Sequence, residues 1–208
     1  MKKSLYLLPI MILMLSACGN KQADIGTSAK VEDSTVNTSQ NENSSTKEAS
    51  QKDNNTTKDG QRVEKDFGSF VVADGFGEAK EQSGNGRYFY VVKGHEHDMR
   101  PDNISINEGH QNYNLDESEK FAQSTTWQLN MQIKQSGIDA TVTGSSGKTD
   151  AGDIMYIFDI KMNGSDEIDR QYYILRDKKF VMVFMSNFDG DESVNKAAEL
   201  MAKSFEWE

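Results

Sequence analysis

The sequence predicts an α+β fold, an antiparallel β-sheet flanked by two helices, which follows an N-terminal leader and a polar tether. Three observations support this prediction. Runs of β-branched and aromatic residues, bounded by Gly, Asp and Asn, recur along residues 62–208. Two further segments carry apolar residues at helical spacing. Short turn signals such as Asn163-Gly164 join successive strands, which favours antiparallel pairing.

Residues 1–17 have the pattern of a secretory signal peptide. Lys2 and Lys3 are basic, residues 5–15 are apolar apart from one proline, and small residues follow. The apolar run is too short to cross a membrane as a mature helix, which needs about 20 residues. We therefore expect it to be removed.

The sequence Leu15-Ser16-Ala17-Cys18 resembles the lipobox that bacterial lipoprotein signal peptidase recognises. The resemblance implies cleavage before Cys18 and a lipid on its sulfur, which would hold the protein on the extracytoplasmic face of the cell membrane. The alternative is a soluble secreted protein with a stray cysteine. Cys18 is the only cysteine in the chain, so no intramolecular disulfide can form and the domain must fold by its core alone.

Residues 18–61 are rich in Ser, Thr, Asn, Gln, Lys and Asp and contain no aromatic residue and no proline. Such a segment cannot bury enough apolar surface to offset its chain entropy, so we predict a disordered tether. As a flexible coil it would span roughly 35–40 Å. Long polar tethers of this kind are similar to those of Gram-positive lipoproteins. Residues 62–208 then form a single globular domain.

Six strands are predicted in that domain. The last of them is apolar on both faces and should be central in the sheet, and its partner precedes it across a turn at Asp177-Lys178. The strands are 67–73, 87–92, 103–108, 154–162, 168–176 and 179–187.

Two amphipathic helices are predicted. The first is capped by Asn114 or Asp116 and ends at Ser136-Gly137, and the second covers about 192–203. We expect both to pack on the sheet. The expected buried residues are Phe121, Ala122, Thr125, Leu129 and Ile133 in the first helix, and Val194, Ala197, Ala198, Met201 and Phe205 in or after the second.

The order of these elements resembles the Mog1/PsbP-like fold. The hairpin from Gln171 to Met185 and a last helix that runs into Ser204-Phe205 carry the resemblance. It implies a curved antiparallel sheet flanked by helices. A Gly-Trp pair is expected after the first strand, where this chain has Gly75-Phe76. Proteins of this fold have unrelated activities, so no functional residue is carried over.

Two motifs have ordinary structural explanations. Residues 144–149 are similar to the end of a phosphate-binding loop, but Val142 stands where the motif needs its first glycine and a strand follows, so we expect a flexible hairpin loop. The acidic residues 189, 191 and 192 are similar to part of a calcium loop without its terminal glutamate. Helix capping explains Asp191, and solvation explains a second acidic group at 166–169.

The three histidines are the candidate metal ligands. His95 and His97 point the same way in an extended segment, and a returning loop could bring His110 close, which would form a zinc site with nearby carboxylates. The alternative is a polar loop that contains these residues by chance. No other cofactor is expected.

Trp127 and Met131 lie one turn apart, off the main buried stripe of the first helix. They either widen the core or form a patch that binds a partner. No serine lies in a nucleophile-elbow pattern, so an enzyme is not expected. The formal net charge is −10, and removal of Lys2 and Lys3 with the leader makes it −12, which argues against nucleic-acid binding.

The leading hypothesis is therefore a membrane-anchored, extracytoplasmic lipoprotein that acts as a non-enzymatic binding or accessory module. Its partner would be a surface or cell-wall protein or a small ligand. The alternative is a zinc-binding or metal-assisted protein that uses the histidine cluster.

Overall fold

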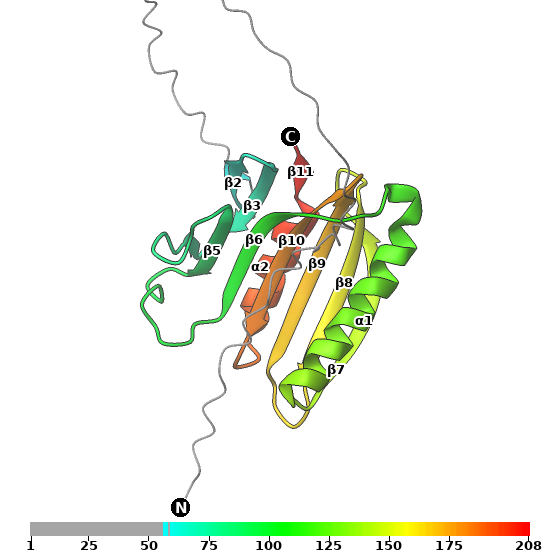
Figure 1. The fold of residues 1–208 in the computed structure, drawn as a ribbon. Helices are drawn as coiled ribbons and strands as arrows, with labels where there is room; N and C mark the ends of the chain where they lie inside the picture. The colour runs from blue at the N-terminus through cyan, green and yellow to red at the C-terminus, as the bar shows by residue number, and fades with distance from the viewer. Residues whose placement is uncertain (1–55, 58) are drawn as a thin grey trace, which may run out of the picture. The chain divides into compact units, whose positions relative to one another are not determined.

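The computed structural model describes residues 56–57 and 59–208. The leader, the lipobox residues Leu15, Ser16 and Ala17, Cys18 and the tether up to residue 55 lie outside the described residues. The described part confirms the predicted fold class, because it consists of antiparallel sheets and two α-helices (Figure 1).

The described strands form a small sheet and a large sheet. Neighbouring strands of both sheets pair antiparallel throughout. The small sheet has the order β1 (Thr56–Thr57), β2 (Gly60–Lys65), β3 (Gly68–Ala73) and β11 (Glu206–Trp207). The large sheet has the order β4 (Phe76–Glu78), β5 (Arg87–Val92), β6 (Asn103–His110), β10 (Lys179–Asn187), β9 (Ile168–Arg176), β8 (Ile154–Met162) and β7 (Ala140–Lys148).

Strand β10 lies at the centre of the large sheet, as its sequence predicts. It pairs with β6 on one side and with β9 on the other. Alternate residues of β10 enter two different cores, because side chains of a strand point to opposite faces in turn. Val181, Val183 and Met185 belong to the first core, and Phe180, Met182 and Phe184 to the second.

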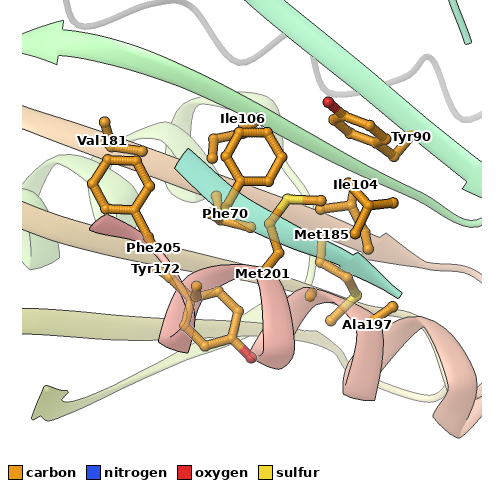
Figure 2. Packing of buried hydrophobic residues seen from close by; sticks show 14 of the residues in the cluster. Phe70, Tyr90, Ile104, Ile106, Tyr172, Val181, Met185, Ala197, Met201 and Phe205 are labelled. Carbon is orange, nitrogen blue, oxygen red and sulfur yellow. The ribbon is translucent and has the colours of Figure 1, made fainter. Parts of the chain in front are cut away.

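The first core lies between the large sheet, the small sheet and α2 (Glu192–Lys203). Figure 2 shows Ala197 and Met201 of α2 facing Met185, with Phe70 of β3 and Phe205 close by. The predicted buried residues of this helix are all confirmed, since Val194, Ala197, Ala198, Met201 and Phe205 are at most 3% exposed. Asp191 caps the helix by accepting a hydrogen bond from the Ser193 backbone N–H at 2.8 Å.

The second core lies under α1 (Ser118–Ser136), on the opposite face of the large sheet (Figure 1). A 3₁₀ turn at Leu115–Glu117 precedes the helix with Asn114 as its cap, and Gly137 ends it with a φ of 70°. Phe121, Thr125 and Leu129 are buried. Ala122 and Ile133 are partly buried against the same cluster, so the predicted stripe is confirmed.

Five strands differ from the prediction. Residues 144–148 form most of β7, not a hairpin loop, because all nine residues of that strand pair with β8. Strand pairing here overrides the weak strand propensity of Gly and Ser. The strands β1, β2, β4 and β11 are absent from the prediction, since β2 has a polar sequence and the other three have two or three residues each. The predicted domain start at Arg62 falls inside β2.

Met185→Ala tests the first core. Met185 is fully buried, so truncation should lower the free energy of unfolding by about 2–5 kcal/mol. Met99→Ala is the matched control, since the Met99 side chain is fully exposed and its loss should change stability by less than about 0.5 kcal/mol. Urea denaturation measures both. Equal effects of the two variants would contradict the assigned core.

Candidate functional site

The structure does not bring the three histidines together. His95 and His97 lie in the loop that joins the end of β5 to the start of β6. The ends of this loop are close together, because Val91 pairs with Asn103. His110 ends β6, where it pairs with Lys179. A strand of eight residues extends about 23 Å at about 3.3 Å per residue. The structure therefore does not bring the predicted zinc ligands His95, His97 and His110 together, because most of the length of β6 separates His110 from the other two.

The two loop histidines have local acidic neighbours. His95 Nδ1 lies 2.7 Å from a carboxylate oxygen of Asp98, and His97 Nδ1 lies 3.9 Å from one of Glu81. Both histidine side chains are mostly exposed, at 57% and 82%. Among residues 59–208, no group of three or more His, Cys, Asp or Glu side chains is arranged to hold a metal ion. These contacts are those of a solvated loop.

The segment similar to a phosphate-binding loop lies in β7 and the turn that follows it. Thr149 Oγ1 accepts a hydrogen bond from the Asp153 backbone N–H at 3.1 Å and closes that turn. A strand then follows, whereas phosphate binding requires the N-terminus of a helix. The structure therefore gives no support for nucleotide binding by residues 144–149.

The acidic residues after β10 shape the entry to α2. Asp189 accepts a hydrogen bond from the Asp191 backbone N–H at 2.9 Å, and Asp191 caps the helix as predicted. Asp102 accepts one from the Phe188 backbone N–H at 2.7 Å. Burial raises the pKa of Asp102, and the nearby Asp189 carboxylate raises it further. The carboxylates here organise the loop.

A buried carboxyl group lies beside this loop, at Asp169 in β9. It is 5% exposed and accepts a hydrogen bond from Ser186 Oγ at 2.6 Å, across the register of β9 and β10. Burial raises the pKa of Asp169 to about 6; the bond from Ser186 lowers it, the charge of Glu167 raises it and that of Arg100 lowers it. The sequence predicts that solvation explains the acidic group at 166–169. For Asp169 this explanation is wrong, because the pairing of β9 with β10 buries its side chain.

Arg100 connects the loop after β5 to the end of the large sheet. Its guanidinium lies 2.6 Å from Glu167 and stacks over the Phe188 ring at 3.9 Å from the ring centroid. These contacts join the β5–β6 loop to the β8–β9 turn and the β10–α2 loop. Asp169 therefore lies at a polar junction that supports the fold and shows no catalytic arrangement.

A hollow of about 220 Å³ lies between the β2–β3 turn and the start of β5. Its volume matches about seven water molecules, which is below the usual size of a pocket for an organic ligand. Glu108, which lines it, is already paired with Lys179 at 2.6 Å. The hollow is lined by Asp66, Phe67, Asn85, Gly86, Tyr88, Asn107 and Glu108.

The most exposed aromatic side chain of the described chain is Trp127, on the outer side of α1. It is 65% exposed, whereas Met131 one turn later is partly buried. Trp127 therefore does not widen the core. A large apolar ring left in water on a rigid helix is a candidate contact for a partner.

Asp169→Asn tests the buried carboxyl group. The folded state holds its proton up to about pH 6, while the unfolded chain releases it near pH 3.9, so the free energy of unfolding should fall by about 3 kcal/mol between about pH 4 and pH 6. The Asn variant should lack this part of the fall. Urea denaturation across this range measures it, with the exposed Asp166→Asn as control. Parallel pH profiles of wild type and Asp169→Asn would contradict the assignment.

Comparisons with known proteins give a match among solved structures only. No family model matches this chain, and no curated protein matches it. The chain is similar to the solution structure of cyanobacterial PsbP (CyanoP) from Synechocystis sp. PCC 6803, with a TM-score of 0.49 and 14% sequence identity. The match covers 71% of this chain and 92% of that chain. No functional residue is carried over from that structure.

Proposed function

We propose that this protein is a lipid-anchored, extracytoplasmic accessory module that binds a partner protein through the outer face of α1 around Trp127. The observation that carries the proposal is the exposure of this ring, at 65%, on a helix whose opposite stripe is buried. Tryptophan is enriched among the residues that dominate binding energy at protein interfaces. A binding role therefore explains the one large aromatic ring that is mostly exposed in the described part of the chain.

The neighbours of Trp127 on α1 support a protein partner. Gln123, Thr126 and Asn130 are exposed around it and carry no charge. An aromatic anchor with a rim of amides and hydroxyls is suited to an interface with a polar edge and an apolar centre. A polyanionic partner such as nucleic acid is not expected, because the chain is acidic overall and would repel it.

The anchor is proposed from the sequence around Cys18, since the lipobox resemblance and the single cysteine agree. The polar segment that follows is long enough to place a domain roughly 35–40 Å from a membrane surface. In the described part of the chain, no helix is long and apolar enough to cross a membrane. The lipid would supply the membrane contact.

The contacts of the polar side chains favour a binding role over a catalytic one. His95 and His97 contact neighbouring carboxylates, and Asp189 and Asp191 accept backbone hydrogen bonds. Nucleophilic catalysis needs a nucleophile beside a base that a third group orients. We therefore propose that the protein acts by binding.

Cys18→Ala tests the anchor. The variant should lose palmitate label and leave the membrane fraction, either as a precursor or as a released domain, because the thioether can form only at this sulfur. A Ser45→Ala change in the tether is the control and should keep both properties. Lipid label that persists on Cys18→Ala would contradict the lipoprotein proposal.

A photo-crosslinking residue at position 127 tests the binding face. In intact cells it should give a discrete crosslinked protein, while the same residue at the exposed Lys196 position on α2 should not. Trp127→Ala should leave the free energy of unfolding within about 0.5 kcal/mol of wild type, because the ring packs against little. Identical crosslinking from both positions would count against the α1 face.

A further inference from the structure

Strand β7 presents a long unpaired edge. It is the last strand in the order of the large sheet and pairs with β8 along all nine of its residues. No second strand pairs with it among residues 56–57 and 59–208. Its outer side therefore offers a row of backbone N–H and C=O groups to solvent.

The usual protections of an edge strand are missing here. The sequence of β7 contains no proline, and Lys148 at its end is its only charged residue. The opposite edge of the same sheet, β4, has three residues and offers little backbone to pair with. Long, uncharged edges are rare in proteins that stay monomeric, because they pair with other strands.

Helix α1 leaves most of this edge open. Ala140 and Val142 are partly buried against the core under α1, whereas Gly144, Ser146 and Lys148 on the same face are exposed. Thr143 and Ser145 on the other face are exposed as well. The helix thus covers only the first part of β7, and residues 143–148 are accessible from both faces.

We propose that two copies of this chain associate by antiparallel pairing of β7 with β7, centred on Gly144. A two-fold axis perpendicular to the sheet places each strand in register with itself. Thr143 then lies opposite Ser145 of the second copy, a hydroxyl pair of the kind that stabilises antiparallel strands. Ala140 lies opposite Lys148, so no like charges of the strand face each other.

A two-fold axis perpendicular to the sheet leaves both α1 helices on the same face of the joined sheet. The covered end of each β7 lies beside the bare end of the other, because antiparallel pairing reverses the strand direction. The pairing involves all nine residues of β7, of which α1 covers only the first part.

The negative charge of the chain opposes this association. Each copy has a formal net charge of −10, so two copies repel each other over a distance that salt shortens. The paired edges are small compared with a typical stable interface, so the dimer should be weak. Its population should rise with protein concentration and with ionic strength.

Paired cysteines test the register. In full-length chain carrying Cys18→Ala, Thr143→Cys and Ser145→Cys are made as separate variants, so each copy has one thiol. Directly opposite residues have Cβ atoms about 4.5–5.5 Å apart, close to the reach of a disulfide. Mild oxidation of the two variants mixed should give a mixed disulfide dimer at several times the yield of either variant alone.

Two controls are a cysteine placed away from β7 and a lysine placed on its edge. Thr143→Cys mixed with Ser165→Cys, an exposed turn position, should give no such excess. By sedimentation equilibrium, the chain with Cys18→Ala alone should dimerise reversibly, more so at higher salt, and the same chain with Ser145→Lys added should remain monomeric. Equal yields from mixed and separate variants, or a Cys18→Ala chain that stays monomeric up to about 1 mM, overturn the proposal.

Discussion

The burial of both faces of β10 is the constraint on which the rest of this structure depends. A strand that is apolar on both faces needs a neighbour on each side and a cover on each surface. The chain supplies β6 and β9 as neighbours, and α2 with the small sheet and α1 as covers. With no disulfide in the described domain, these two cores must carry its stability. Val183 and Phe184, adjacent in sequence, each belong to a different core.

This arrangement decides where polar groups can be tolerated. The junction of Asp169, Ser186 and Arg100 lies where β9 and β10 meet the loops. There the strand pairing brings the Ser186 hydroxyl to the buried Asp169 carboxyl group, and Arg100 pairs with Glu167. The price of burying a carboxyl group appears as a raised pKa. In the described part of the chain, the same packing around two cores leaves Trp127 on α1 exposed and β7 at the edge of the large sheet.

The zinc site considered from the sequence required three histidines to lie close together, and the fold does not bring them together. His95, His97 and His110 are close along the chain, but an extended strand carries the last of them far from the others. The glycines and serines at 144–148 have the composition of a loop, yet β8 offers them a complete pairing partner. For the histidines, closeness along the sequence was a poor guide, because an extended strand converts few residues into a long path. For residues 144–148, composition was a poor guide, because strand pairing outweighs the weak strand propensity of Gly and Ser.

The sequence by itself determined the strands and helices whose side chains repeat with a clear period. The bounds of β8, β9, β10 and α2 follow from alternation and helical spacing, since these patterns reflect which face each side chain buries. Trp127 was also identified from its position off the helical stripe. Only the tertiary structure decided that its ring stays exposed, that Asp169 is buried, that β7 is an edge strand and that the histidines lie apart. These properties depend on which distant segments pair, and the alternation in a strand records which face is buried, not which strand lies beside it.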